Sequence, residues 1–286
     1  MSSATDKTFL LGTGCQKGGT SWLFHYLKDS PQFVEGYRKE YHVLDALHVP
    51  AMEYRKKEVI EEAEAVLKRA RRGGPINARK LHLASMYADP EIYFDYFTSL
   101  LTSRADARVT ADVTPSYGML PGDVLAQVKR SFADRGLRTV AVFLMRDPVD
   151  RILSHIRMKL RHNPDRFDKQ AHELLLEWHT DPQYQLRTRY DETIAALDQV
   201  FADDERYYGF YETLFDVERI REICALLRID FHPPKLDERR NASPPADAPE
   251  STQRVVAEHY RGVYQAVAAR FPEVDLERLW PSTKFT

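Results

Sequence analysis

The segment Gly14–Ser21 combines a lysine with three glycines in the order Gly-Cys-Gln-Lys-Gly-Gly-Thr-Ser. It lies between an apolar run at residues 8–11 and a helical pattern at residues 20–27. Glycines at such a junction let backbone amides turn inward, and a helix N-terminus adds positive potential. The segment therefore predicts a cradle for a phosphate or a similar oxyanion. Lys17 is expected to reach the bridging oxygen of a short anhydride bound there.

Two familiar nucleotide-binding patterns nearly fit this segment and fail. Lys17 stands where a dinucleotide fingerprint needs its third glycine. Thr20 stands where a nucleotide-triphosphate loop needs its lysine. A nucleotide kinase on the same strand–loop–helix scaffold is therefore an alternative that the spacing disfavours.

A second motif begins at Arg146, directly after the mostly apolar run 138–145. This run predicts a strand that is buried on both faces. Asp147 and Pro148 are typical of the first positions of a helix. Ligands of open α/β sheets bind at the carboxyl ends of the strands. We therefore expect Arg146 to make a bidentate phosphate contact, and Ser154, two turns into the helix, to donate to the same phosphate.

Together the two motifs resemble those of the sulfotransferases that use 3′-phosphoadenosine 5′-phosphosulfate (PAPS). That family has a Lys-Gly-Gly-Thr-type loop for the 5′-phosphosulfate and an Arg-Asp-Pro segment, followed by Arg and Ser, for the 3′-phosphate. Further segments match in the family's order over about residues 8–228. Arg38–Asp45 resembles the Lys-Glu-x-His-Phe-Phe-Asp stretch of heparan-type carbohydrate sulfotransferases, and Thr114–Tyr117 resembles their substrate loop. Phe210–Leu214 resembles the Tyr-Glu-x-Leu segment that lies near the adenine.

The resemblance implies a donor site, an acceptor site and roles for their residues. Lys17 and the loop amides would hold the leaving 5′-phosphate, whereas Arg146 and Ser154 would select the 3′-phosphate. The implied donor-site residues are Gln16, Lys17, Gly18, Gly19, Thr20, Ser21, Trp22, Arg146, Ser154, Tyr211, Arg239 and Arg240. The implied acceptor-site residues are Lys39, Glu40, His42, Thr114, Pro115 and Tyr117.

Two residues compete for the role of general base, the group that takes the acceptor's proton during attack. Glu40 follows a predicted strand at Gln32–Gly36, which would put it near the carboxyl end of the sheet, where Lys17 also points. The matching glutamate of heparan-type relatives takes this role. His42 is the alternative, because a histidine serves as base in the cytosolic small-molecule branch of the superfamily.

The chain also departs from the family pattern. Val43 and Leu44 stand where heparan-type relatives have paired aromatic residues. The family usually closes over the 3′-phosphate with a basic loop that contains glycine. Residues 239–243, Arg-Arg-Asn-Ala-Ser, stand at about that place without the glycine. The expected role of Arg239 and Arg240 at the 3′-phosphate therefore rests on their position and charge alone.

The elements that would hold these motifs alternate between strands and helices. Such alternation predicts an α/β fold with three layers, P-loop-like, in which helices flank a central parallel sheet. We expect residues 1–286 to form one sulfotransferase domain. The expected strands are residues 8–11, 32–36, 107–113, 138–145 and 207–210. The expected helices are residues 20–27, 53–72, 90–103, 123–132, one from 147 onward, two within 168–202, 217–227 and 251–270.

Composition narrows the class of protein. The 286 residues carry 41 Lys and Arg against 43 Asp and Glu, a net charge of −2 that argues against a general nucleic-acid binder. Two cysteines and the lack of a signal-peptide pattern or a long apolar run predict a cytoplasmic protein without a transmembrane segment. No metal-ligand spacing is found, so we expect PAPS as donor, its product 3′-phosphoadenosine 5′-phosphate (PAP), and no metal. The acceptor would be a small molecule, carbohydrate or lipid, and the remaining alternative is a non-catalytic nucleotide-binding module. No pattern predicts an oligomeric state.

Overall fold

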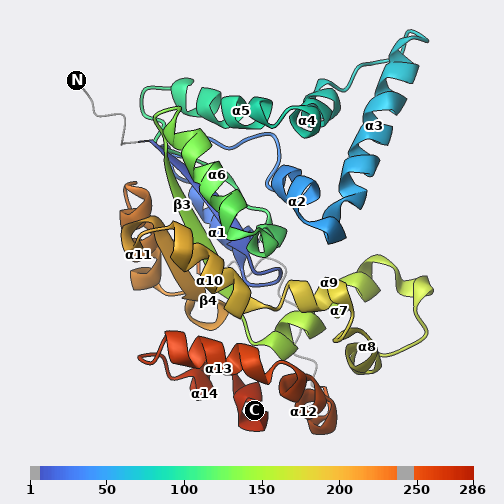
Figure 1. Ribbon diagram of the computed structural model, residues 1–286, viewed down its shortest axis with the longest axis vertical. Coiled ribbons are helices and arrows are strands. Elements are labelled where there is room, and N and C mark those ends of the chain that lie inside the picture. Colours follow the sequence, from blue (N-terminus) through green and yellow to red (C-terminus); the bar gives the residue numbers. More distant parts are fainter. Residues whose placement is uncertain (1–6, 237–247) are drawn as a thin grey trace.

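Four parallel strands form the central sheet in residues 7–236 and 248–286, which the computed structural model describes (Figure 1). The strands are β1 (Thr8–Gly14), β2 (Val109–Asp112), β3 (Arg138–Met145) and β4 (Arg206–Phe210), in the order β2-β1-β3-β4. All seven residues of β1 are buried, because this strand pairs with β2 on one side and β3 on the other. Parallel neighbours need long crossover connections, and the helices supply them.

Helices cover both faces of the sheet and give the protein two hydrophobic cores. Leu10, Val140 and Leu144 pack with α1 (Thr20–Lys28) and α11 (Val217–Leu227) on one face. Phe9 and Phe143 point to the other face, which α5 (Pro90–Thr102), α6 (Gly122–Ala133) and α10 (Tyr190–Val200) cover. The alternation of side chains along each strand thus produces three layers, and the predicted three-layer α/β fold is confirmed.

The remaining helices lie beyond the edges and ends of the sheet (Figure 1). Three of them, α2, α3 and α4, connect β1 and its helix to α5, and three others, α12 to α14, end the chain. None of the helices in the described part of the chain is long and apolar enough to cross a membrane. Their bounds are α2 (Val43–His48), α3 (Tyr54–Ala70), α4 (Ala78–Ala88), α7 (Pro148–His162), α8 (Ala171–Trp178), α9 (Pro182–Leu186), α12 (Glu250–His259), α13 (Arg261–Arg270) and α14 (Leu276–Leu279).

Three of the expected elements are wrong. The segment 32–36 is not a strand, because it makes only an isolated bridge between Phe33 and Val109 at the edge of the sheet. Residues 168–202 form three helices rather than two, since the short α9 lies between α8 and α10. The segment 251–270 is two helices that meet at Tyr260.

Candidate functional site

A cavity of about 420 Å³ lies where the loops after β1 and β3 meet the starts of α1 and α7. Most of the residues that the sequence suggested face it. The predicted residues that line the cavity are Gln16, Lys17, Gly19, Thr20, Ser21, Trp22, Lys39, Glu40, His42, Pro115, Arg146, Ser154 and Tyr211. Both motifs therefore contribute to one concave site at the carboxyl ends of adjacent strands.

The glycine loop is shaped by two residues that cannot carry a side chain. Gly19, the N-cap of α1, has φ 91°, and a Cβ there would lie 2.6 Å from Cδ2 of Leu214. A Cβ on Gly18 would lie 2.4 Å from the carbonyl oxygen of Leu144. The first N–H groups of α1 have no acceptors within the helix, so its start can hold an anion. The N–H of Gly18 differs, because it donates to the Cys15 carbonyl at 3.0 Å and is used within the loop.

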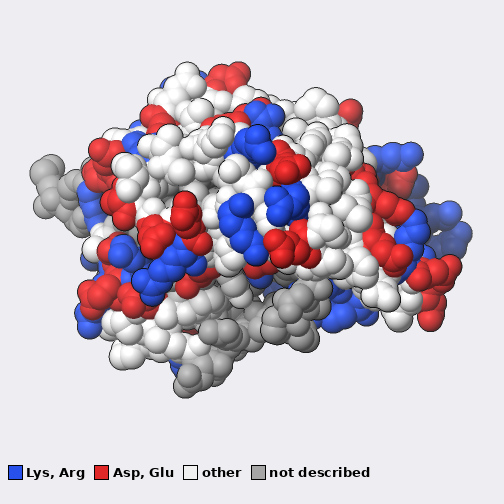
Figure 2. All heavy atoms as spheres, turned by 90° about the horizontal axis from the view of Figure 1, so that it is seen from below, with Lys and Arg blue, Asp and Glu red and all other residues white. Residues whose placement is uncertain are grey.

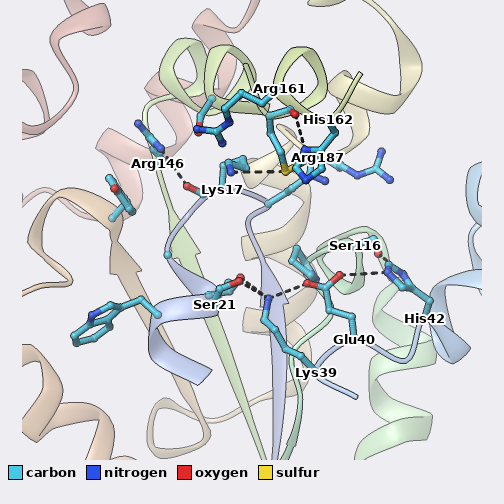
Figure 3. A pocket seen from close by; sticks show the side chains of 18 of the residues that line it. Lys17, Ser21, Lys39, Glu40, His42, Ser116, Arg146, Arg161, His162 and Arg187 are labelled. Atoms are coloured by element: carbon cyan, nitrogen blue, oxygen red, sulfur yellow. Dashed lines mark hydrogen bonds and ion pairs between the residues drawn. The ribbon is translucent and has the colours of Figure 1, made fainter. Parts of the chain in front are cut away.

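Lys17 lies in the middle of the cavity, and no carboxylate of the described residues neutralises it. Its ammonium has Met158 Sδ as a neighbour at 3.9 Å, and no described residue forms an ion pair with it (Figure 3). Burial lowers the pKa of Lys17, and the charges of Arg161 and Arg146 lower it further. The ammonium is therefore held in an environment that an anionic ligand would stabilise.

Arg146 follows β3 and offers a second unneutralised cation. Its Nη1 donates to the Lys17 carbonyl at 3.3 Å, and its guanidinium lies 4.3 Å from the ring centroid of Tyr211. Its Nε is buried and has no hydrogen-bond partner. Ser154 lines the same cavity and is only 2% exposed. A guanidinium with unused donors, together with a hydroxyl in the same cavity, can bind a phosphate.

Aromatic rings form one end of the cavity. Trp22, Tyr211 and Phe215 all line it, and the ring of Phe215 packs at 73° to that of Trp22 and at 90° to that of Tyr211. The ring centroids are 5.2 Å apart for Trp22 and Phe215 and 5.4 Å for Tyr211 and Phe215. Flat aromatic surfaces of this kind suit a planar ligand ring.

Glu40 is held as a carboxylate by Lys39 and His42 at the other end of the cavity (Figure 3). Lys39 Nζ donates to Glu40 Oε1 at 2.8 Å and to Ser21 Oγ at 2.9 Å, and His42 Nε2 lies 3.4 Å from Glu40 Oε2. Burial by itself would raise the pKa of Glu40, but the hydrogen bonds and charges of His42 and Lys39 lower it to about 2. The side chain is 38% exposed, so an acceptor can reach it.

His42 is positioned from behind by a second carboxylate. Its Nδ1 lies 2.8 Å from Asp45 Oδ2, and the Ser116 hydroxyl also donates to Asp45. Burial alone would lower the pKa of His42, but the bonds to Asp45 and Glu40 raise it. Of the two predicted candidates for the base, Glu40 is the more exposed, with 38% of its side chain accessible against 14% for His42.

Two of the predicted acceptor residues do not face the cavity. Thr114 and Tyr117 are fully buried and both donate to Asp112, Thr114 Oγ1 to Oδ1 at 2.6 Å and the Tyr117 hydroxyl to Oδ2 at 2.7 Å. Burial raises the pKa of Asp112 to about 6. Thr114 also accepts from the Tyr41 amide at 3.1 Å. These residues therefore anchor the segment that carries Glu40 rather than contacting a ligand. Residues 239 and 240, the predicted Arg pair, lie outside the described residues.

The sequence reasoning missed three arginines that line the cavity: Arg55, Arg161 and Arg187. One signal was available, because Ser154 and Arg161 are seven residues apart and fall on one face of a helix. Arg55 belongs to a charge-rich helix whose pattern predicts a solvent-exposed face. Arg187 follows a five-residue helix that the sequence did not reveal.

The charge of the site is strongly one-sided. Among the described residues, six lysines and arginines line the cavity, against a single carboxylate, that of Glu40. Figure 2 shows a different balance on one outer face of the protein, where acidic and basic side chains are interspersed. The positive charge is thus concentrated inside the cavity. Across the two described parts of the chain, no group of His, Cys, Asp and Glu is arranged to hold a metal ion.

The fold of the chain resembles that of solved structures. A sulfotransferase from Alicyclobacillus acidocaldarius superposes with a TM-score of 0.59 over 92% of this chain and 94% of its own length, at 16% sequence identity. The chain has a sulfotransferase fold. The sulfotransferase domain of the Synechococcus PCC 7002 olefin synthase gives a TM-score of 0.45 at 17% identity, covering 89% of this chain and 94% of that domain. No family model matches the chain, and no curated protein matches it in sequence.

Proposed function

We propose that the protein is a sulfotransferase that moves a sulfuryl group from PAPS to a hydroxyl or amine acceptor. One observation carries this proposal above the others. Lys17 and Arg146, which follow adjacent strands of the sheet, are both cations without carboxylate partners among the described residues. PAPS carries charged groups on both sides of its ribose, and two such sites side by side suit it.

The residues present fit the donor. The start of α1 and Lys17 would hold the 5′-phosphosulfate, and Arg146 with Ser154 would hold the 3′-phosphate. The aromatic end of the cavity beside Trp22 and Tyr211 would take the adenine. The unpartnered Nε of Arg146 supports the fit, because a buried donor without an acceptor is costly until a ligand supplies one.

Glu40 would act on the acceptor and Lys17 on the leaving group. During attack the acceptor oxygen forms a bond to sulfur, and the bond from sulfur to the bridging oxygen of the 5′-phosphosulfate breaks. Glu40 takes the acceptor's proton, and Lys17 stabilises the electron pair that passes to the bridging oxygen. Positioning and charge stabilisation would dominate, as in phosphoryl transfer.

Lys39 would adjust the strength of Glu40 as a base. A carboxylate with a pKa of about 2 accepts a proton poorly at neutral pH. Lys39 also bonds Ser21 Oγ at the start of α1, so a bound sulfuryl oxygen would compete with Glu40 for its ammonium. Loss of that ion pair would raise the pKa of Glu40 when the donor is in place.

A ligand panel tests the proposal directly. We expect PAP to raise the melting temperature without added metal, and more than ATP with Mg²⁺, ADP or NAD at equal concentration. Incubation with PAPS and a panel of hydroxyl and amine compounds should then release PAP. Stronger stabilisation by ATP with Mg²⁺ would overturn the proposal in favour of a nucleotide kinase. PAP binding without PAP release from PAPS would favour a non-catalytic nucleotide-binding module.

We also propose that residues 1–286 form one domain. Both hydrophobic cores are built on the same four-stranded sheet, which supports this division of the chain.

A further inference from the structure

Two arginines that line the cavity are not among the residues assigned to the donor. Figure 3 shows Arg146 at one side, Lys17 in the middle, and Arg187 and His42 toward the opposite side. Arg55 also lines the cavity. Neither Arg55 nor Arg187 forms an ion pair with a carboxylate of the described residues.

Arg187 is held in place by neutral groups only. Its Nη1 donates to the Gln183 carbonyl at 2.7 Å, and its Nη2 contacts Met52 Sδ at 3.2 Å. Burial lowers the pKa of Arg187, and the positive charges of Arg151 and Arg55 lower it further. The guanidinium therefore sits near two other cations with little solvent around it.

The side chains around Arg187 add positive charge and almost no negative charge that would compensate for it. Arg55 has a buried Nε without a hydrogen-bond partner. Arg151, fully buried, donates to the Tyr184 carbonyl and to Thr188 Oγ1, and its Nε and Nη1 are unpartnered. The carboxylate that most affects Arg187, that of Asp45, is already bonded to His42 and Ser116. Like charges held together in this way are unfavourable until an anion binds between them.

Different charges act on Lys17 and on Arg187. The charges that most affect Lys17 are those of Arg161, Arg146 and Lys39. The cations that most affect Arg187 are Arg55 and the fully buried Arg151. Arg55 and Arg187 both line the cavity without being among the residues assigned to the donor, so they are left for another anion.

We infer that Arg55 and Arg187 form an anion subsite for the acceptor. The acceptor would then carry a carboxylate, phosphate or sulfate group, which these two arginines bind while its hydroxyl lies at Glu40. This assignment rests on the proposed function, because it takes the donor to occupy the Lys17 and Arg146 end. It narrows the acceptor from any hydroxyl or amine compound to an anionic one.

Anion titrations by calorimetry test the subsite, with and without saturating PAP. The probes are inorganic phosphate, inorganic sulfate and acetate, and the tightest of them identifies the kind of anionic group. We expect Arg55→Gln and Arg187→Gln to weaken binding roughly ten- to hundredfold, the effect of losing a hydrogen bond to a charged group. Arg187→Lys should retain most of the affinity. PAP affinity should stay unchanged in all three variants.

Arg189→Gln is the matched control, because Arg189 is two residues away and already pairs with Asp191 and Glu192. It should bind the anions as the wild type does. Should Arg187→Gln not fold, Arg55→Gln decides the matter, since Arg55 lies on the mostly exposed α3. The inference is overturned if no probe binds the wild type, or if the glutamine variants bind as well as the wild type. Failure of PAP to bind would instead count against the proposed function.

Discussion

Replacing Arg146 with glutamine should reduce the preference of the protein for nucleotides that carry a 3′-phosphate over those that lack one. Arg146 contributes one hydrogen bond of 3.3 Å to the Lys17 carbonyl, and its buried Nε has no partner. Because the free protein gives this guanidinium so few contacts, its loss should have little effect on folding. Its main effect should appear when a 3′-phosphate is present.

The magnitude follows from the kind of contact that is lost. A hydrogen bond to a charged group contributes about 1.5–3 kcal/mol. The dissociation constant of PAP should therefore rise roughly 10- to 150-fold, at about 1.4 kcal/mol for each factor of ten. Adenosine 5′-phosphate lacks the 3′-phosphate, so its dissociation constant should change by no more than about threefold, the effect of one weak neutral hydrogen bond.

Calorimetric titration of both ligands into both proteins measures this difference. Lys17→Met provides the contrasting variant, because the 5′-phosphate is common to both ligands and both should bind more weakly. If Arg146→Gln weakened the binding of PAP and of adenosine 5′-phosphate equally, Arg146 would be shown to act by supporting the glycine loop around Lys17. No change in either titration would refute the assignment of the 3′-phosphate to this residue.

Three more substitutions test the site and the fold. Glu40→Gln should cut PAP release from PAPS by roughly 10²–10⁴-fold with PAP affinity unchanged; near-normal release, with a collapse in His42→Ala, would transfer the role of base to His42. Gly19→Ala should lower the free energy of unfolding by about 1–3 kcal/mol, since φ is 91° and Leu214 blocks a Cβ; denaturant titration with an unchanged midpoint would contradict this. Burial raises the pKa of Glu212 to about 7, so the folded state binds more protons than the unfolded state at intermediate pH. The free energy of unfolding therefore falls as the pH rises from about 4.5 to about 7. Glu212→Gln should therefore lose about 1–3 kcal/mol less of its unfolding free energy than the wild type does between pH 4 and pH 8, and an equal loss in both proteins would argue against it.

The elements nearest the donor motifs could be predicted because local sequence determines them. The apolar run that becomes β3 spans the predicted residues 138–145, and the glycine loop does lie between a strand and a helix. The prediction of a strand at Gln32–Gly36 was wrong, because strand formation there depends on pairing with a neighbouring strand. Only Phe33 pairs with Val109 before the Tyr37 amide turns to bond the Tyr96 hydroxyl.

The interruption of the last predicted helix also comes from tertiary contacts. Residues 251–270 have an amphipathic pattern throughout, yet Tyr260 adopts φ −95° and ψ 14°. Its buried hydroxyl donates to the His179 carbonyl, far away in the sequence. The pattern of apolar residues within the segment gives no indication of a partner so far away in the sequence.

The same limit explains the incomplete prediction of the cavity. Arg55 and Arg187 are far apart in the chain, so no motif spacing links them. Thr114 and Tyr117 show the opposite error, because a familiar motif suggested ligand contact while Asp112 holds both side chains in the core. Sequence patterns located the part of the cavity around Lys17 and Arg146 better than the part around Arg55 and Arg187, since the latter two come from separate segments that no motif links.

The pairing of β1 with β3 fixes the distance between the two motifs that carry Lys17 and Arg146. Gly14 is paired with Phe143, and the Cys15 amide donates to the Leu144 carbonyl at 2.6 Å, so the ladder continues up to both motifs. Neighbouring strands are about 4.8 Å apart, a spacing that backbone hydrogen bonds fix whatever the side chains are. In the proposed sulfotransferase, the span that the donor's phosphates must match would therefore be set by the backbone. Substitutions on the outer helices would then alter the choice of acceptor while this span stays constant.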